Sequence, residues 1–365
     1  MSAMRVALAH DFIRHGGAER VLEQLHEIWP SAPVYTLLYE KNSAYADWDV
    51  RPSWLQKIVP ASKYRWPLPY YPRLVEKLRI REPVDLVVSS SVSWMKGLRA
   101  PEGAAHLCYI HRPMMFAYDR QADFLASYPA PFRPMLRRLA ARIRDWDQAT
   151  ANRPDLYVAN SRYTAQRVQE LYGRKAEVVY PPVAIGPYED AGRAAEVEPY
   201  FLTVSRLDSY KRVDLIVAAC TRLGLPLKVA GRGPELESLR AIAGPTVEFL
   251  GFVPTAELPG LMASCRAFLF SAEEDFGIAP VEAQAAGRPV LAFGAGGCLE
   301  TVIPSVTGEH FAEQSAECLI EALQRFVPER YDPARIRQHA AGFSEPLFRQ
   351  RINALAVDLL ARGRR

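Results

Sequence analysis

The chain has 365 residues, of which 49% are hydrophobic and 24% charged, and this length supplies two cores of ordinary size. The five cysteines are widely spaced and form no C-x-x-C pair, which argues against a disulfide framework or a cysteine-based metal site and favours reduced thiols. The first apolar run is too short for a signal peptide, and no run approaches the ~20 residues of a membrane span, so we expect a cytoplasmic protein.

The net charge of +4 hides an asymmetry along the chain. Residues 1–185 carry 26 Lys and Arg against 18 Asp and Glu, whereas the remainder carries 19 against 23. A basic half is typical of proteins with an anionic partner, such as lipid headgroups, a lipid-linked phosphate or nucleic acid. A solvated basic surface explains the same asymmetry equally well.

Short β-branched runs alternate with segments of helical period along the first half of the chain. The strands are predicted at 5–9, 85–89, 106–110, 155–160 and 176–180, and the helices at 17–29, 132–151 and 161–172. This alternation predicts a parallel sheet covered by helices. The following stretch, 181–199, is rich in Pro, Gly and Ala without periodicity, and we interpret it as a linker.

The same alternation restarts after the linker. Strands are predicted at 200–205, 226–231, 247–251, 266–270 and 289–293, with helices at 210–223, from 234, at 256–264 and from 280. A second doubly wound sheet follows from this order. Since functional loops lie at the carboxyl ends of parallel strands, we expect ligands in a cleft between two such domains.

A glycine pair and a histidine in the first half follow predicted strands, where ligand-binding loops lie. Gly16 and Gly17 precede the first helix, and such a pair lets main-chain N–H groups approach a phosphate or a leaving oxygen. The G-x-G-x-x-G spacing is missing, which disfavours a nicotinamide-dependent dehydrogenase. His111 directly follows the strand at 106–110 and can face the cleft, although a lone histidine is more often structural.

Two segments of the first half are basic and aromatic. Residues 51–81 contain eight Lys and Arg and one Glu, and they are a candidate for docking a lipid-linked acceptor or an anionic membrane. Residues 133–144 hold five Arg beside an apolar stripe that we interpret as core-facing, made by Phe132, Met135, Leu136, Leu139 and Ile143. Single-stranded nucleic acid also binds such segments, but no nucleic-acid-binding fold is recognisable, so no nucleic-acid partner is expected.

A pair of cations marks the start of the second half. Arg206 lies at the end of a predicted strand, and Lys211 lies five residues later in the expected first turn of a helix. A diphosphate bound there meets two fixed positive charges and a helix N-terminus. Taken alone, the two residues are as well explained as solvated surface cations.

The stretch "EEDFGIAPVEA" (273–283) holds two glutamates eight positions apart. Pro280 suits the first position of a helix, which places Glu282 in the first turn, where a carboxylate is favoured and can accept from a vicinal diol such as ribose. Glu274 in the preceding loop can accept from a second ring, which the N–H groups around Gly277 approach without obstruction. A ligand that spans both glutamates carries two polyols, as a sugar nucleotide does.

The tripeptide D-W-D occurs at 47–49 and at 145–147. It represents the alternative to Arg206 and Lys211, in which a metal ion held by aspartates neutralises the diphosphate. Neither copy lies at the end of a predicted strand, where a nucleotide-bound Mg²⁺ or Mn²⁺ would need it. We therefore interpret both as surface acids and expect no metal.

The run from Glu274 through Gly277 to Glu282 resembles the retaining GT-B glycosyltransferases of family 4, whose hallmark is E-x7-E followed by a small-residue helix, Gly, x-Pro-Val and a strand. The order of flanking elements agrees over nearly the whole chain. The resemblance implies an α/β protein with two Rossmann-like domains facing each other across a cleft. These are an acceptor-binding domain at 1–182, completed by a returning helix at 345–365, and a nucleotide-sugar-binding domain at 183–344.

The resemblance also implies residue roles. The implied catalytic residues are Arg206 and Lys211 at the donor diphosphate, Glu274, and His111 at the transferred sugar. The implied donor-binding residues are Gly16, Gly17, Gly231, Arg232, Gly233, Val253, Phe276, Gly277, Ile278 and Glu282. Among them, Gly231 to Gly233 border the nucleoside and the Val253 backbone bonds the base.

The combination of "HDF…GGAERVL" with "HRPMMFAYD" looks most like bacterial mannosyltransferases that build O-antigen and related surface polysaccharides, except that Arg112 stands where an acid commonly follows the histidine. This implies transfer of a hexose, with mannose from GDP-mannose as the leading interpretation, to a lipid-linked saccharide with retained configuration. The alternatives are a UDP-sugar donor in the same fold and a non-catalytic protein that binds sugar nucleotides. We expect a cytoplasmic protein, with peripheral contact to an anionic membrane as a further hypothesis.

Overall fold

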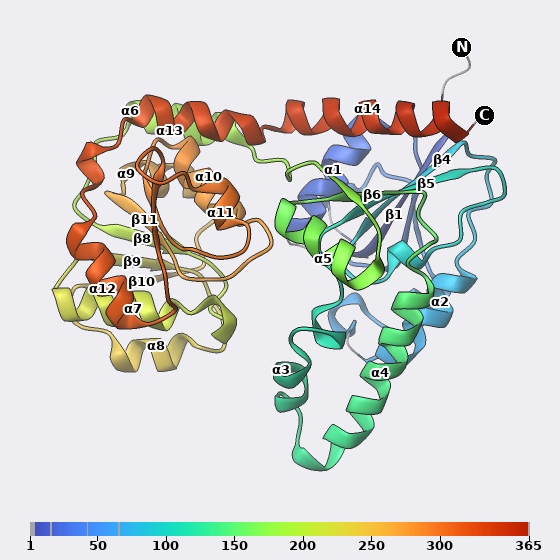
Figure 1. The fold of residues 1–365 in the computed structure, drawn as a ribbon, viewed down its shortest axis with the longest axis horizontal. Coiled ribbons are helices and arrows are strands. Elements are labelled where there is room, and N and C mark those ends of the chain that lie inside the picture. Colours follow the sequence, from blue (N-terminus) through green and yellow to red (C-terminus); the bar gives the residue numbers. More distant parts are fainter. Residues whose placement is uncertain (1–3, 15–16, 42, 65, 364–365) are drawn as a thin grey trace. The chain divides into compact units, whose positions relative to one another are not determined.

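The computed structural model describes residues 4–14, 17–41, 43–64 and 66–363. The chain divides into two compact units: Met1–Tyr180 with Phe348–Arg365, and Pro181–Leu347. Each unit contains one parallel sheet flanked by helices (Figure 1).

The sheet of the first unit has seven strands in the order β3-β2-β1-β4-β5-β6-β7. Their bounds are β1 (Val6–Ile13), β2 (Val34–Tyr39), β3 (Val50–Pro52), β4 (Leu86–Ser91), β5 (Ala105–Ile110), β6 (Leu156–Ala159) and β7 (Ala176–Val178). All neighbours are parallel. The sequence analysis missed β2 and β3, which extend the sheet beyond the predicted strands.

Side-chain alternation along β1 divides the first core in two. Val6 and Leu8 belong to the cluster that includes α1 (Gly17–Ile28) and the C-terminal helix, while Ala7 and Ala9 belong to a second cluster. The second cluster includes α2 (Tyr71–Lys77) and part of α4 (Arg133–Ala149). The remaining helices are α3 (Gln121–Ala126) and α5 (Arg162–Tyr172). Both faces of the sheet are therefore covered, as expected for a doubly wound fold.

The C-terminal helix α14 (Glu345–Gly363) packs on the first unit, as predicted. Phe348, Ile352 and Ala356 are buried in the cluster with α1, and Leu355 and Leu359 pack against it. The i, i+4 spacing of the three buried residues gives the helix one apolar face. The chain thus returns to its first unit after completing the second.

The second unit has six parallel strands in the order β10-β9-β8-β11-β12-β13. The strands are β8 (Phe201–Val204), β9 (Leu227–Ala230), β10 (Val247–Gly251), β11 (Ala267–Phe270), β12 (Val290–Phe293) and β13 (Gly308–Phe311). The helices are α6 (Ile185–Ala194), α7 (Val213–Leu223), α8 (Leu236–Ile242), α9 (Leu258–Ser264), α10 (Ile278–Ala285), α11 (Cys298–Thr301), α12 (Ala316–Arg325) and α13 (Pro333–Ala340). The predicted fold class is confirmed, although β13 was not anticipated.

The interpretation of 181–199 as a linker is wrong for its central part. Residues Ile185–Ala194 form α6, and Tyr188 is buried within the second unit. A Cβ atom on Gly192 would lie 2.2 Å from the carbonyl oxygen of Ala286. The small residues of this segment therefore permit close packing against the end of α10, which composition alone does not distinguish from flexibility.

The apolar stripe on α4 is core-facing only in part. Leu136 and Ile143 are buried, but Phe132 and Met135 at the start of the helix are 55% and 60% exposed. The prediction was therefore wrong for Phe132 and Met135.

The second D-W-D tripeptide is not wholly a surface feature, because Asp147 is fully buried. Its carboxylate lies 3.0 Å from Lys96 Nζ and accepts hydrogen bonds from the Tyr118 and Tyr172 hydroxyls, each at 2.8 Å. Burial lowers the pKa of Lys96, while Asp147 opposes that shift. Asp147 therefore completes an internal network instead of acting as the predicted surface acid. Asp49, in the first tripeptide, is exposed and pairs with Arg51.

Candidate functional site

The switch point of the second sheet lies between β8 and β11, since β9 and β10 continue on one side and β12 and β13 on the other. At such a point the connections leave in opposite directions and open a crevice at the carboxyl ends of the strands. The loop after β8 carries Arg206 and Lys211, and the loop after β11 carries Glu274. The predicted donor residues of this unit thus follow the strands that border its switch point.

Lys211 and Glu274 form an ion pair between these two loops. Their side chains are 13% and 23% exposed, so the pair is partly shielded but remains accessible. The Ser271 hydroxyl lies 3.1 Å from the carbonyl oxygen of Lys211 and 2.6 Å from that of Arg212. Ser271, which directly follows β11, therefore ties the Lys211 loop to the neighbouring strand. The sequence analysis missed this residue, although its place at a strand end was visible.

Lys211 does not lie in the first turn of an α-helix as expected. It ends the 3₁₀ turn Ser209–Lys211, and α7 begins only at Val213. Arg212 between them has the left-handed backbone with φ of 51°, which is uncommon for a residue other than glycine. This conformation separates the lysine from the helix and redirects the chain.

Arg206 differs from Lys211 in its surroundings. Its side chain is 74% exposed, lies 3.4 Å from Asp208 and donates to the Tyr210 hydroxyl at 2.8 Å. The Lys211 ammonium lies 5.0 Å from the centre of the Tyr210 ring. Tyr210, which the sequence analysis did not identify, therefore contacts both predicted cations.

Glu282 lies one turn later in α10 than predicted. The helix begins at Ile278, so Pro280 is its third residue and Glu282 its fifth. Gly277, with φ of 84°, allows the chain to enter the helix directly from the loop. Gly287, just after the helix, has the left-handed conformation, with φ of 78°. Glu282 is 5% exposed, and its place in the second turn weakens the argument from the helix dipole.

The Phe276 ring is directed into the protein core. The residue is 3% exposed, and its ring centre lies 5.5 Å from that of Phe343. Ile278 is half-buried at the start of α10. A contact of Phe276 with a ligand would therefore use its backbone.

A glycine pair after β12 supports the Glu274 loop. The Gly297 N–H donates to the Glu274 carbonyl oxygen at 2.8 Å. A Cβ atom on Gly296 would lie 2.2 Å from the same oxygen, so a larger residue would displace the loop. Neither glycine was identified from the sequence as part of the site. Their position after a predicted strand was the signal of this role.

The loops after β8, β9 and β10 contact one another. Gly231 donates its N–H to the Gly251 carbonyl at 2.7 Å, and Leu207 donates to the Arg232 carbonyl at 3.0 Å. A Cβ atom on Gly231 would lie only 1.8 Å from the Ser205 carbonyl oxygen. Glycine is therefore required at this position by the neighbouring backbone.

The other predicted nucleoside residues border the same loops. A Cβ atom on Gly233 would lie 2.3 Å from the Leu207 carbonyl oxygen. The Arg232 guanidinium lies 5.7 Å from the ring centre of Phe252, the residue before the half-buried Val253. Gly231, Arg232 and Gly233 are thus held beside the loop after β8, and Val253 follows in the loop after β10.

The switch point of the first sheet lies between β1 and β4 and carries neutral polar groups. His10 Nδ1 lies 3.1 Å from the Ser90 carbonyl oxygen, which can only accept, so Nδ1 carries the proton. The Ser90 hydroxyl lies 2.8 Å from Nε2 of His111, which follows β5 as predicted. Burial lowers the pKa of His10 to about 4 and that of His111 to about 3, the latter also through the charge on His10. Both imidazoles are therefore neutral near pH 7.

Asp11 follows His10 in β1 and is bonded to the main chain of a neighbouring loop. It is 1% exposed and accepts main-chain hydrogen bonds from Ser93, Trp94 and Met95. Burial raises its pKa to about 6 against the effect of these donors. Asp11 therefore anchors the loop after β4. Of the predicted glycines nearby, Gly17 is the first residue of α1 and Gly16 lies outside the described residues.

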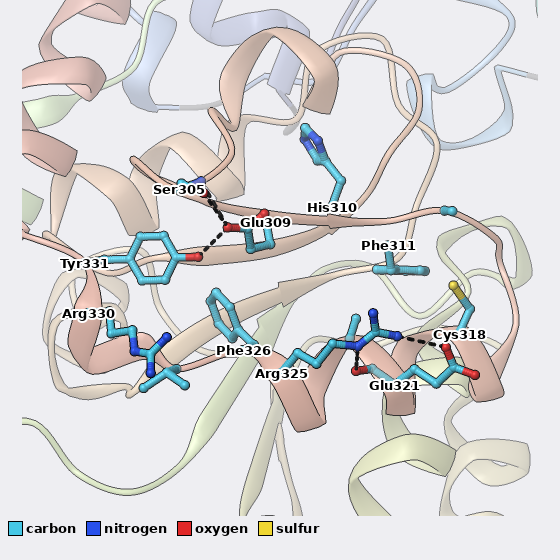
Figure 2. Close-up of a pocket in the computed structure, with 13 residues that line it drawn as sticks. Ser305, Glu309, His310, Phe311, Cys318, Glu321, Arg325, Phe326, Arg330 and Tyr331 are labelled. Carbon is cyan, nitrogen blue, oxygen red and sulfur yellow. Dashed lines mark hydrogen bonds and ion pairs between the residues drawn. The ribbon is translucent and has the colours of Figure 1, made fainter.

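A hollow of about 610 Å³ lies elsewhere in the second unit, beside the edge strand β13 (Figure 2). Glu309 there accepts hydrogen bonds from the Tyr331 hydroxyl at 2.9 Å and from Ser305, and Arg325 pairs with Glu321 at 3.0 Å. These polar groups satisfy one another, and β13 is separated from the switch point by β12. We therefore place the candidate site at the switch point.

Two further properties concern only the part of the chain that the structure describes. It contains no group of three or more His, Cys, Asp or Glu side chains arranged to hold a metal ion. None of its helices is sufficiently long and apolar to cross a membrane.

Two family descriptions match successive parts of the chain. Residues 15–185 match "Glycosyltransferase Family 4", and residues 188–342 match "Glycosyl transferases group 1". The two matches together span most of the sequence. The chain belongs to the GT-B glycosyltransferases of family 4.

Individual similarities are more distant. The chain is 29% identical to a GDP-mannose-dependent alpha-(1-6)-phosphatidylinositol monomannoside mannosyltransferase of Mycobacterium tuberculosis over 62% of this chain and 64% of that protein. It is 26% identical to the mouse alpha-1,3/1,6-mannosyltransferase ALG2 over 60% of this chain and 59% of that protein. The matches thus span less than two thirds of each relative. Sucrose-phosphate synthase of Thermosynechococcus elongatus has a similar fold, with a TM-score of 0.72, 19% identity and coverage of 98% and 100% of the two chains.

Proposed function

We propose that the chain transfers mannose from GDP-mannose to a hydroxyl of a lipid-linked saccharide, with retained anomeric configuration, in the synthesis of a surface polysaccharide. The observation that carries this proposal is the accessible Lys211–Glu274 pair at the switch point of the second sheet. Two relatives that are mannosyltransferases support the sugar, and the name of one of them includes both GDP-mannose and a lipid acceptor.

In this proposal Lys211 and Arg206 bind the donor diphosphate. Departure of the nucleotide concentrates negative charge on its terminal phosphate, and preorganised cations stabilise charge that develops in a transition state. Binding of the donor exchanges the Lys211–Glu274 pair for two new contacts, with the ammonium on phosphate and the carboxylate on sugar hydroxyls. Glu274 therefore also positions the lysine before the donor arrives.

The remaining donor contacts come from the loops already described. We assign Glu282 to the ribose, and the backbone around Gly277 to the sugar. Gly231, Arg232 and Gly233 border the nucleoside, and the Val253 backbone bonds the base. The backbones of Phe276 and Ile278 complete this part of the site. The first unit supplies the acceptor site, with Gly16 and Gly17 beside the leaving oxygen or phosphate and His111 at the transferred sugar.

The chemistry we propose needs no side-chain base. The acceptor attacks from the face that the diphosphate leaves, and the departing phosphate takes the acceptor proton. His111 is neutral because burial lowers its pKa to about 3, so it acts as a hydrogen-bonding group and not as a cation. The two fixed cations replace a metal ion at the diphosphate. We place the reaction in the cytoplasm, at the anionic inner face of the plasma membrane.

A calorimetric comparison of GDP with UDP tests the donor. GDP should bind at least about tenfold more tightly than UDP, a difference of about 1.4 kcal/mol. The Lys211→Ala variant should weaken both nucleotides, because the lysine contacts the shared diphosphate. Tighter binding of UDP would replace the proposed donor by a UDP-sugar. GDP binding without transfer or hydrolysis of GDP-mannose would instead favour a non-catalytic binding protein.

A further inference from the structure

An apolar groove crosses the surface of the first unit. It has a volume of about 460 Å³, and its walls include the 3₁₀ turns Trp54–Lys57 and Leu68–Tyr70 and helix α2. Trp54, Ile58, Trp66 and Tyr70 line it and are 58%, 69%, 70% and 62% exposed, respectively. Large apolar side chains that cluster on an exposed surface are more typical of a binding site than of the rest of a monomer's surface.

The groove has a firm floor. Leu55 and Leu74, which also line it, are buried and belong to the core cluster on one face of the sheet. The Ser53 hydroxyl accepts from the Leu55 N–H at 3.3 Å and donates to the Leu37 carbonyl oxygen at 2.8 Å, which ties the first wall to β2. The exposed side chains of the groove therefore lie on a part of the first unit that is packed against its core and bonded to its sheet.

A second, cationic hollow adjoins the groove. Its volume is about 560 Å³, and it shares Trp54, Leu74 and Lys77 with the groove. Arg79 and Arg81 also line it and are exposed. Lys77, Arg79 and Arg81 make no ion pair with any residue in the described ranges, whereas Arg51 in the same hollow pairs with Asp49 and Glu82. Positive charge without an internal counter-ion thus lies directly beside an apolar channel.

We propose that these two hollows form one site for a long-chain lipid phosphate or diphosphate, the lipid part of the acceptor. The apolar chain lies in the groove, where the indole and phenol rings cover it, and the phosphate lies beside Lys77, Arg79 and Arg81. Guanidinium groups suit phosphate oxygens because they donate two parallel hydrogen bonds. Each hollow falls in the volume range of ligand pockets, roughly 300–1,000 Å³. This inference rests on the proposed function for the identity of the lipid.

One molecule with a head and a tail fits this arrangement better than a flat bilayer surface. The groove is concave, so it encloses a chain from several sides, and the cationic hollow adjoins it through the shared residues Trp54, Leu74 and Lys77. Attraction to a bilayer would need neither the concavity nor the continuity. Charge complementarity therefore selects the anionic end of the ligand, and the apolar lining selects its chain.

The test uses farnesyl diphosphate as a monomeric probe with the full chain. Calorimetry should show that it binds at least tenfold more tightly than inorganic diphosphate or farnesol, since each of these fills one hollow only. Trp66→Ser should weaken the probe at least fivefold without affecting inorganic diphosphate. Arg79→Gln combined with Arg81→Gln should weaken both anions. Arg137→Gln with Arg138→Gln, which makes the same charge change on exposed residues of α4, is the matched control and should leave probe binding unchanged.

Several outcomes would overturn the inference. Equal affinity for the probe in wild type and in the groove and hollow variants would place its binding elsewhere. Binding of the probe no tighter than that of inorganic diphosphate would leave an anion site only. Binding to anionic vesicles without binding of the probe would assign the surface to a bilayer. GDP binding and transfer to a lipid-free saccharide are measured in the same variants, so failure of the proposed function is seen separately from failure of this site.

Discussion

The two switch points share a topology but differ in charge. In the second unit, oppositely charged Lys211 and Glu274 pair across the loops and remain partly exposed. In the first unit, neutral groups form a chain at the corresponding position, with His10 bonded to the Ser90 backbone and the Ser90 hydroxyl bonded to His111. The neighbouring carboxylate of Asp11 is buried and bonded to the main chain of the loop after β4. This contrast is consistent with the proposal that the second sheet binds the anionic donor and the first binds uncharged hydroxyls.

The difference arises from where each side chain is attached. His10 lies inside β1, directly opposite Ser90 of β4 in the sheet register, so water is excluded and its pKa falls. Lys211 and Glu274 lie on loops beyond the strand ends, where they are partly exposed and attract each other. Burial inside the strand thus keeps His10 neutral, whereas the strand-end loops of the second unit tolerate a charged pair.

The largest expected effect comes from removing the cations of the second switch point. Replacing Lys211 or Arg206 with Ala should lower turnover of GDP-mannose about 10²-fold or more, as expected for loss of one preorganised electrostatic donor. Initial rates at saturating substrate measure this. Arg222→Ala is the matched control, because Arg222 is an exposed cation of α7 that pairs only at the surface with Glu317. Near-normal rates in both test variants would remove these residues from the mechanism.

The first unit should be the more acid-sensitive of the two. Burial lowers the pKa of His106 to about 3 and places it below that of the unfolded chain, so the unfolded state binds more protons below pH 6.5. Its contribution to stability is therefore present above pH 6.5 and is lost as the pH falls toward 3. His10 and His111 act in the same direction. Asp11 acts oppositely, because its raised pKa favours the folded state at low pH and that contribution is lost as the pH rises through 6.

Tryptophan fluorescence can follow this unfolding, because all six tryptophans belong to the first unit. One pKa unit corresponds to about 1.4 kcal/mol, so His106 alone should cost up to a few kcal/mol between pH 7 and pH 4. His106→Asn should flatten the dependence of the urea midpoint on pH. An unchanged pH dependence in this variant would show that His106 does not control the acid response.

The sequence was enough to predict the fold and to select Lys211 and Glu274 as candidate site residues, but it did not predict the contact between them. Alternating strands and helices were visible locally, and the spacing from Glu274 to Glu282 carried the family resemblance. The Lys211–Glu274 pair was not predicted, because it depends on two loops brought together by strand order. The left-handed Arg212 was likewise hidden, since the residues around it read as the start of a helix.

The wrong interpretations share a physical cause. Asp147 was assigned to the surface because its partner Lys96 is remote in sequence, although pairing with it permits full burial. The glycine and alanine content of α6 was taken as flexibility, although Gly192 packs against the Ala286 backbone. In both cases the contact that determines the structure joins residues far apart in the sequence, so neither composition nor local pattern predicts it.

A smaller effect should follow from changes at the neutral switch point. Ser90→Ala removes the hydroxyl that orients His111, and loss of one neutral hydrogen bond costs about 1 kcal/mol, or roughly fivefold in kcat/KM. Ser89→Ala is a matched control, because Ser89 is equally buried but bonds His106, at 2.7 Å. Equal losses in the two variants would indicate a general packing effect instead of orientation of His111.

The smallest expected effect is that of chelation. If Lys211 and Arg206 neutralise the donor diphosphate, a divalent cation has no charge left to stabilise there. The aspartates that form the rival motif are also engaged, since Asp147 pairs with Lys96 and Asp49 with Arg51. Transfer rates in EDTA should therefore equal those in buffer, with added Mg²⁺ or Mn²⁺ changing them less than twofold. Loss of activity in EDTA with recovery in Mn²⁺ would contradict this prediction. It would also mean that a bound metal ion supplies part of the positive charge at the second switch point. Lys211 would then serve mainly to position Glu274.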